Sequence, residues 1–324
     1  MGCKLVAASR SAVRPRLLLS MCLGVKPVRH DGGIVFDVLV EALKRYVEVV
    51  AVCPEVGIGL GVPRSPLVLN EIEGRVELVD TSSGLKLTRN VEEFTERILE
   101  GLAVDGVLLK SASPSCGVGD AKIYGPGRQV LRRGDGIFTS LLKRRMPCIP
   151  FESEKRLYSY GIRRTFLTRL FSLAELRETL SSLKSREDLV DFHRRYKYII
   201  MLYSPTALKH LGRLVARRES CEIQDLAARY RDGFTRALCR NPSRGSYANV
   251  LTHVYGHLKW KLNPSERKYA LNLIKGYKAG RESLRTVVSY FRGFAHRFGI
   301  EYLAEQRFLS PYPDELDNVG LEPE

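Results

Sequence analysis

Three short apolar runs in the first half of the sequence are each followed by a single cysteine. The runs predict buried strands at residues 17–20, 47–52 and 107–109. The cysteines that follow them are Cys22, Cys53 and Cys116. Helical spacing in residues 36–46 completes a strand–helix–strand unit, so the first two strands should be parallel with a right-handed crossover. Since ligands in open α/β sheets bind beyond the carboxyl ends of the strands, the three thiols could meet at one point.

The rest of the first half continues this pattern. Helices are predicted at residues 91–102 and 136–145, a β-hairpin at 67–79 and a last strand at 147–151. A glycine-rich loop is expected after Cys116. We therefore expect an α/β domain with a doubly wound parallel sheet over residues 16–165.

The second half has helical periodicity with short breaks. Asn263-Pro264 marks a helix start and Gly280 a helix end. We predict a basic connecting region over residues 152–184 and an all-α domain over residues 186–316. The helices of this domain are expected at residues 188–203, 205–218, 223–239, 246–261, 265–279 and 282–298.

The positive charge of the chain is concentrated in this second half. The net charge is +16, and residues 1–154 have 21 Lys and Arg against 18 Asp and Glu, an excess of 3. Residues 155–324 have 31 against 18, an excess of 13. An excess of that size attracts a polyanion, and nucleic acid is the first candidate. The alternative is a charged surface of the thermophile type, which would usually carry more balancing glutamate.

Several classes of protein are disfavoured by the sequence. The seven cysteines are odd in number and widely spaced, which does not indicate a disulfide framework, and the absence of a C-x-x-C pair argues against a zinc ribbon. No apolar run reaches the roughly 18 residues of a membrane span, and residues 1–16 lack the apolar core of a signal peptide. We expect a cytoplasmic protein without a membrane partner, and its oligomeric state is left open.

Three cysteines without a fourth partner indicate an incompletely coordinated metal centre. Thiolates hold iron–sulfur clusters, normally four to a four-iron cluster, so three would leave one iron with an exchangeable position. Such an iron is a soft Lewis acid suited to binding sulfur. The alternative for an isolated cysteine is a small buried hydrophobe, and we assign that role to Cys148, Cys221 and Cys239.

Four sequence blocks around the three cysteines carry a more specific signal. They are Ser20-Met21-Cys22-Leu23, Val28-Arg29-His30-Asp31-Gly32, Cys53-Pro54-Glu55 and Leu109-Lys110-x-x-Ser113-Pro114-Ser115-Cys116-Gly117. Together they resemble the thiouracil desulfidase family, over residues 16–170. The resemblance implies a 4Fe–4S cluster bound by Cys22, Cys53 and Cys116. It also implies that the open iron takes up the sulfur of a thiolated pyrimidine, which water replaces without net redox chemistry.

Two departures from the family pattern concern contacts to the substrate. His30 stands where the family usually has tyrosine. The glycine that follows the first cysteine comes one position early, at Gly24. Neither position bears on the cysteines that would bind the cluster.

Hydrolytic removal of sulfur needs a base for the attacking water and a proton donor for the ring. Glu55 lies two residues beyond Cys53 and is our candidate general acid and base. The alternative role for Glu55 is a helix-capping or ion-paired glutamate. Lys110 is expected to stabilise an anionic intermediate or to pair with Glu55.

Two serines and one charged pair complete the predicted site. Ser113 and Ser115 flank the third cysteine and could orient water or the base edge, or instead cap backbone groups of the loop. Arg29 and Asp31 are our candidates for substrate binding. Their alternative role is to pair with each other and brace the first cysteine loop.

Further blocks in the second half resemble a second family. They are Asp191-Phe192-His193-x-x-Tyr196-Lys197, Leu211-Gly212, Asn249-Val250-Leu251-x-His253-x-x-Gly256 and Gln306-x-x-Leu309-x-Pro311-Tyr312-Pro313. They are similar to the uncharacterised helical domain often fused behind a desulfidase-like domain. Fused proteins of this kind are implied to act on 4-thiouridine in tRNA, with the helical domain holding the RNA. The candidate phosphate contacts are Arg194, Arg195, Lys197, Arg217, Arg218, Lys259 and Lys261.

The sequence therefore predicts a tRNA 4-thiouridine desulfidase with a 4Fe–4S cofactor. Aromatic residues among the basic ones, such as Trp260, could stack on bases, although most of these rings are expected to pack in helix cores. One alternative is a desulfidase of free thiouracil or thionucleosides. Another is a non-catalytic RNA-binding protein whose cluster senses oxygen or iron.

Overall fold

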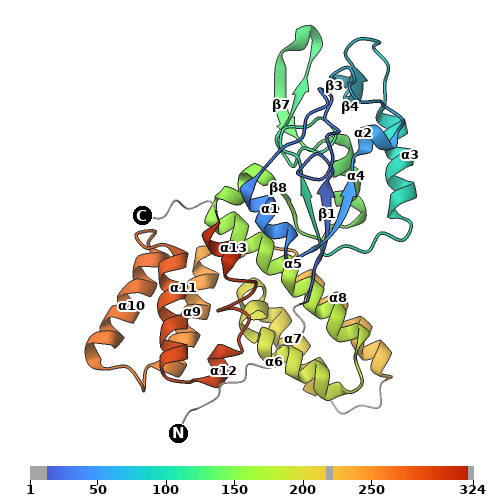
Figure 1. Ribbon diagram of the computed structural model, residues 1–324. Coiled ribbons are helices and arrows are strands. Elements are labelled where there is room, and N and C mark those ends of the chain that lie inside the picture. Colours follow the sequence, from blue (N-terminus) through green and yellow to red (C-terminus); the bar gives the residue numbers. More distant parts are fainter. Residues whose placement is uncertain (1–12, 217–221, 320–324) are drawn as a thin grey trace.

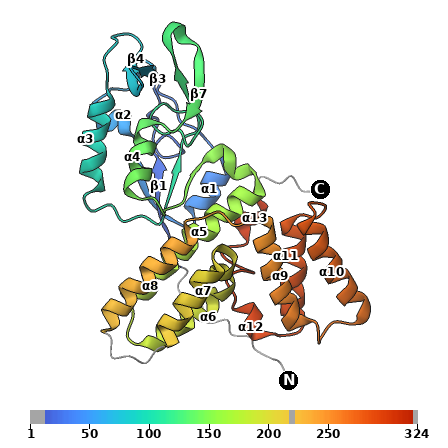
Figure 2. The same cartoon turned by 180° about the vertical axis from the view of Figure 1, so that it is seen from behind.

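The computed structural model describes residues 13–216 and 222–319. An α/β region forms one end of the molecule, and the helices that follow form two groups at the other end (Figure 1). The long helix α5 (Tyr160–Ser181) lies between the two ends, as the view from behind also shows (Figure 2). The predicted fold class, an α/β region with a parallel sheet followed by an all-helical region, is confirmed.

The central sheet of the α/β region has four parallel strands. In spatial order they are β2 (Glu48–Val52), β1 (Arg16–Ser20), β5 (Gly106–Leu109) and β8 (Phe151–Ser153). From β1 the chain crosses over to β2 on one side, and the later strands lie on the other side. The carboxyl end of β1 is therefore a topological switch point, the place where open α/β sheets bind their ligands.

Helices cover both faces of this sheet. Leu17 and Leu19 pack on one face with α1 (Val38–Lys44) and α5. Leu18 points to the other face and packs with α3 (Thr88–Leu99) and α4 (Ile137–Arg145). Alternate residues of β1 are thus buried on opposite sides, as expected for a strand in a doubly wound sheet.

A second, mixed sheet includes strands from before and after the third cysteine loop. Its order is β4 (Arg75–Asp80), β3 (Leu67–Ile72), β6 (Ala121–Tyr124) and β7 (Val130–Gly134). The β3–β4 hairpin was predicted. The β6–β7 hairpin was not, because glycines at its turn, including Gly127 with φ 78°, give that stretch the composition of a loop.

Each of the six helices predicted in the second half is present. They are α6 (Arg186–Tyr203), α7 (Pro205–Ala216), α8 (Ile223–Leu238), α9 (Arg244–Leu258), α10 (Pro264–Lys278) and α11 (Leu284–Arg297). The short helices α12 (Glu301–Ala304) and α13 (Glu315–Asn318) follow them. In the part of the chain that the structure describes, no helix is long and apolar enough to cross a membrane.

Two predictions for the region between the halves were wrong. Residues 152–184 are not a connecting region, because the 22-residue helix α5, with 11 buried residues, lies there after a short 3₁₀ helix at Glu154–Tyr158. The last strand begins at Phe151 rather than at 147, since Pro147 and Pro150 cannot donate to a sheet ladder.

Candidate metal centre

A cavity of about 240 Å³ opens at the carboxyl ends of β1, β2 and β5. Cys22, Cys53 and Cys116 all line it. Cys22 and Cys53 are half-buried, whereas Cys116 is only 6% exposed. The three cysteines expected at strand ends therefore line one cavity, and their role as ligands of a common metal group stays a prediction.

Each of these cysteines has its backbone fixed by a different element. The carbonyl oxygen of Cys22 accepts a hydrogen bond from Val35 N, at 2.8 Å. Cys53 is the N-cap of the short helix α2 (Pro54–Gly57). Cys116 donates its backbone N–H to Ser113 Oγ at 3.0 Å, and its carbonyl accepts from Thr139 Oγ1 at 2.8 Å. The backbone of each cysteine is thus held by hydrogen bonds or by the start of a helix.

The third cysteine loop packs directly on the start of α4. The first N–H groups of α4 donate to this loop, with Ile137 N to Pro114 O at 3.1 Å and Phe138 N to Ser115 O at 3.0 Å. Gly136 allows this approach, because a Cβ atom there would lie 2.4 Å from the backbone C and O of Ser115. The glycine is required by the close approach of two backbones.

Burial makes the thiolate form of these cysteines unfavourable without a cation. Burial and the neighbouring Cys53 raise the pKa of Cys22 to about 11, against the opposing charge of Lys110. Burial also raises the pKa of Cys53, and it raises the pKa of Cys116 far above its usual value. A bound metal deprotonates its thiol ligands and compensates their charge. Three converging sulfur donors therefore fit a soft metal group.

The spacing of these donors matters for the kind of metal group. Among residues 13–216 and 222–319, no three His, Cys, Asp or Glu side chains are close enough to hold a single metal ion. In a four-iron cluster each cysteine binds a different iron, so the ligands are more widely spread.

Glu55 lines the cavity and is held by two partners. Its Oε1 accepts from Ser115 Oγ at 2.8 Å, and its Oε2 accepts from Arg64 Nε at 2.8 Å and from Arg64 Nη2 at 2.6 Å. Arg64 also donates to Val28 O at 3.0 Å and to Gly61 O at 3.2 Å. Both charged side chains are nearly buried, with 12% and 8% exposed. The carboxylate is therefore rigidly oriented at the wall of the cavity.

Lys110 lines the same cavity but pairs with a different carboxylate from the one expected. Its Nζ donates to Glu154 Oε1 at 2.9 Å, not to Glu55. The buried Glu154 also accepts from Ser111 N at 2.7 Å and from Ser111 Oγ at 2.6 Å. Glu154 thereby holds the loop that contains Ala112, whose φ of 56° is unusual for a residue other than glycine.

The remaining predicted residues of this site have identifiable roles in the loops. Ser113 Oγ accepts from the backbone N–H groups of Ser115 and Cys116, at 3.2 and 3.0 Å. Arg29 lines the cavity and pairs with Asp31 at 3.3 Å. Asp31 also accepts from Gly33 N at 2.9 Å. The contacts that the alternative roles require are thus present. Ser113 caps backbone N–H groups of its loop, and Arg29 pairs with Asp31.

Sequence reasoning missed Arg64 and Glu154. Arg64 is a single basic residue in the glycine- and proline-rich stretch 57–66, and that isolation could have suggested a specific partner. Glu154 gave no local signal, since its partner Lys110 is 44 residues away in the sequence.

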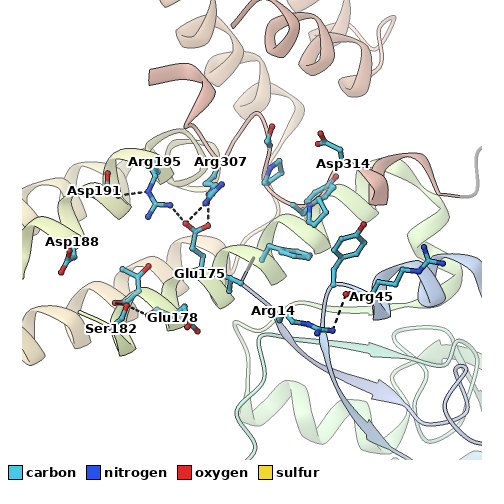
Figure 3. A pocket seen from close by; sticks show the side chains of 18 of the residues that line it. Arg14, Arg45, Glu175, Glu178, Ser182, Asp188, Asp191, Arg195, Arg307 and Asp314 are labelled. Carbon is cyan, nitrogen blue, oxygen red and sulfur yellow. Dashed lines mark hydrogen bonds and ion pairs between the residues drawn. The ribbon is translucent and has the colours of Figure 1, made fainter. Parts of the chain in front are cut away.

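The arginines of α6 that were predicted to contact RNA are engaged in ion pairs. Arg195 is 8% exposed and pairs with Glu175 and with Asp191, at 3.0 Å to the latter. Arg194 pairs with Asp191 at 2.8 Å and with Glu305. Figure 3 shows Arg195 and Arg307 pointing at Glu175 in the wall of a second cavity, of about 1230 Å³. We correct the prediction for Arg195, because a buried and paired guanidinium cannot reach a phosphate.

The other predicted RNA contacts are more open. Lys261 is exposed and Lys197 is half-buried, with its Nζ 6.0 Å from the ring centroid of Tyr198. Lys259 Nζ lies 4.6 Å from the ring centroid of Trp260, which is 76% exposed. Arg217 and Arg218 lie outside the described residues.

Two family models match this chain. One, described as 2-thiouracil desulfurase, matches residues 17–154. The other, described as a protein of unknown function (DUF1722), matches residues 197–313. The two matches fall on the α/β region and on the helical region.

Individual relatives match parts of the chain and cover most of their own length. The uncharacterized protein YbbK of Bacillus subtilis (strain 168) is 31% identical over 140 residues, which cover 39% of this chain and 89% of YbbK. The uncharacterized protein YbgA of Escherichia coli (strain K12) is 26% identical over 148 residues, 45% of this chain and 88% of YbgA. A solved structure described as the 4Fe-4S-dependent thiouracil desulfidase TudS is 35% identical, covers 45% of this chain and 94% of its own, and has a TM-score of 0.37.

Proposed function

The chain belongs, through residues 17–154, to the 2-thiouracil desulfurase family, and we propose on this basis that it is an iron–sulfur desulfidase. We propose further that its substrate is 4-thiouridine in tRNA. The observation that carries the proposal is the meeting of Cys22, Cys53 and Cys116 at one cavity. A carboxylate and a lysine, Glu55 and Lys110, line the same cavity. Thiol ligands and proton-transfer groups are thus available at a single place.

Cys22, Cys53 and Cys116 would hold a 4Fe–4S cluster. When bound, the cluster supplies an open iron that attracts the sulfur of a thiocarbonyl group and polarises its bond to carbon. Lys110 lines the same cavity as Cys22, and its positive charge lowers the pKa of that thiol against the larger effect of burial.

The proton chemistry is assigned to Glu55. Its carboxylate would accept the proton of the attacking water and return it to the departing sulfur or to the ring. Arg64 and Ser115 hold the two oxygens in place, which spares the cost of orienting the carboxylate during the reaction. Ser113, which also lines the cavity, and the pair Arg29–Asp31 are proposed to contact the pyrimidine.

The assignment of tRNA as substrate is supported by charge and by exposed aromatic surface. Residues 155–324 carry an excess of 13 positive charges. The ammonium group of Lys259 lies over the exposed indole ring of Trp260, and Lys261 follows directly in the sequence. Such combinations bind single-stranded nucleic acid through phosphate contacts and base stacking.

The proposal is tested by anaerobic purification with counts of iron and sulfide per chain. We expect about four of each in the wild type, and loss of iron in Cys22→Ala, Cys53→Ala and Cys116→Ala. Cys239→Ala is the matched control, since this thiol does not line the cavity. A wild type that binds no iron after anaerobic purification and reconstitution would refute the proposal.

Substrate choice is tested by supplying thiolated tRNA and free 2-thiouracil separately to the loaded enzyme. Release of hydrosulfide from tRNA is the expected result. Turnover of the free base alone would replace tRNA by a small thiolated pyrimidine. RNA binding without any hydrosulfide release would favour the non-catalytic sensor.

A further inference from the structure

Two cysteines outside the candidate metal centre meet where the α/β region contacts the helical region. Cys148 lies between α4 and β8, and Cys239 is the C-cap of α8. The thiol of Cys239 donates a hydrogen bond to the carbonyl oxygen of Pro147, at 3.4 Å, across 92 residues of sequence. Both thiols are free and half-buried. The fold therefore brings one thiol from each region to the same contact.

The two thiols also interact with each other. Burial, together with the neighbouring Cys239, raises the pKa of Cys148 to about 11. Arg169 of α5 donates to the carbonyl oxygen of Cys148 at 3.1 Å. The backbone N–H of Cys239 is bonded to Arg236 O at 3.3 Å. Both backbones are thus anchored, and the thiol of Cys239 lies against the residue that directly precedes Cys148.

Cys148 is accessible from a cavity of about 350 Å³. Cys148 and Met146 line it from the α/β region, and Thr235 lines it from α8, one turn before Cys239. A small oxidant can therefore reach the contact. The sequence predicted that both cysteines are small hydrophobes buried in a core, but both are only half-buried.

We propose that Cys148 and Cys239 form a reversible disulfide that ties the segment before β8 to helix α8. The oxidant is a small-molecule disulfide. One cysteine thiolate attacks it, forms a mixed disulfide and releases one small thiol. The second cysteine thiolate attacks the mixed disulfide, forms the internal sulfur–sulfur bond and releases the second small thiol. Two protein thiols are oxidised and one small disulfide is reduced, so atoms and electrons balance.

The cross-link would restrict movement between the two regions without involving the metal ligands. Cys148 lies shortly before β8, and Glu154 directly follows the end of that strand. Disulfides between segments distant in sequence restrict the chain most strongly. In reducing surroundings the same pair would return to thiols, as is typical of regulatory rather than structural disulfides.

The test uses the full chain, purified anaerobically with reduced thiols and then incubated with oxidised glutathione. Remaining thiols are blocked with N-ethylmaleimide, and peptides are mapped by mass spectrometry before and after dithiothreitol. We expect a peptide pair joined through Cys148 and Cys239 that dithiothreitol separates. Blocking under denaturing conditions should then find two fewer of the seven cysteines modified.

Cys148→Ser and Cys239→Ser should each abolish the cross-link while keeping the circular dichroism and iron content of the wild type. Two results would overturn the proposal. One is a wild type in which both cysteines carry glutathione separately. The other is an internal disulfide that joins different cysteines, such as Cys22 and Cys53, with Cys148 left free.

Discussion

At the scale of single residues, the candidate site depends on buried charges that satisfy each other. Glu55 faces Arg64, and Lys110 faces Glu154, each pair with side chains at most 19% exposed. Breaking a buried pair leaves the other charge uncompensated, which costs about 3–5 kcal/mol. The site therefore tolerates neutral replacements of similar shape better than truncations, and this guides the choice of variants.

We predict that Glu55→Gln lowers kcat for desulfurisation by roughly 100-fold or more, because a positioned acid–base group typically contributes that much. Glutamine can still accept from Ser115, so iron content should stay at the wild-type level. Both quantities are measured on the same anaerobic preparation. Glu93→Gln is the control, since Glu93 forms an exposed pair with Arg89 on α3. Activity of Glu55→Gln within about threefold of the wild type would remove Glu55 from the proton-transfer role.

The sequence predicted the cysteines but not the residues that support them. Strand ends are local features, so Cys22, Cys53 and Cys116 could be placed without knowledge of tertiary contacts. Arg64 and Glu154 act through partners that only the fold brings near. Of the two roles predicted for Lys110, the pair with Glu55 is replaced by a pair with Glu154, and stabilisation of an anionic intermediate stays a prediction. Pairing between charges is set by loop geometry, which residue types and spacing do not encode.

At the scale of elements, the third cysteine loop and helix α4 form one unit. The loop carbonyls of Pro114 and Ser115 satisfy N–H groups at the start of α4, and Gly136 permits the contact. The position of Cys116 is thus coupled to the packing of α4, whose Phe138 and Leu142 are fully buried in the same core. A disturbance of this contact should move a metal ligand.

We predict that Gly136→Ala reduces iron content and lowers stability by about 1–3 kcal/mol, the usual cost of overpacking. The new Cβ would lie 2.4 Å from backbone atoms of Ser115, which cannot rotate away as a side chain could. Gly161→Ala is the matched control, because its Cβ meets nothing within 4 Å and alanine favours a helix by about 1 kcal/mol. Iron analysis and thermal unfolding check both variants, and equal iron in both would contradict the coupling.

A second prediction at this scale concerns the packing of α6 on α8. His193 Nδ1 lies 3.0 Å from the hydroxyl of Tyr230, and burial, with a smaller effect of Lys197, lowers the pKa of His193 to about 4. The unfolded chain binds this proton near pH 6.5. The neutral imidazole therefore contributes stability above pH 6.5 that is lost as the pH falls toward 4.

We expect this loss to amount to about 1–2 kcal/mol, after allowance for the partial exposure of the ring. It is measured as the difference in pH dependence between wild type and His193→Gln in urea unfolding. Parallel curves for the two proteins between pH 6.5 and 4 would contradict the assignment.

Helix α5 occupies most of the stretch where the sequence predicted a basic connecting region. Its basic residues led to the prediction of a basic connecting region, but Arg163 and Arg164 are buried. Arg164 Nη2 donates to Phe308 O at 2.8 Å, and Arg163 donates to Asp317 O at 3.0 Å. Arginines that bond to the carbonyls of a distant segment look identical, in sequence, to arginines that face water.

At the scale of the whole molecule, α5 and the C-terminal segment connect the two regions. Phe166 and Leu170 of α5 pack against the sheet, together with Tyr312 and Leu316 from the end of the chain. Leu176, further along α5, belongs to the core of the helical region. The domain limit that we proposed at residue 165 therefore falls within a continuous helix. The helical region is thus held against the α/β region through α5 and the segment around Tyr312.

If the helical region holds tRNA, its affinity should fall steeply with salt, because each neutralised phosphate releases bound counterions. We predict that Lys261→Glu flattens the slope of log affinity against log salt by about 1, the contribution of roughly one phosphate contact. Trp260→Ala should instead weaken binding by about 1–3 kcal/mol at every salt concentration, since stacking on an exposed ring does not depend on counterions.

Fluorescence anisotropy of labelled tRNA at several salt concentrations separates these two effects. Lys86→Glu provides a control of equal charge change, because Lys86 is an exposed residue of the α/β region. If Lys86→Glu and Lys261→Glu change the slope equally, binding responds to net charge rather than to this surface. If neither Lys261→Glu nor Trp260→Ala changes affinity, the RNA contacts must lie elsewhere on the molecule. In that case desulfurisation of a small thiolated pyrimidine becomes the simpler account of a cavity that opens beside three cysteines.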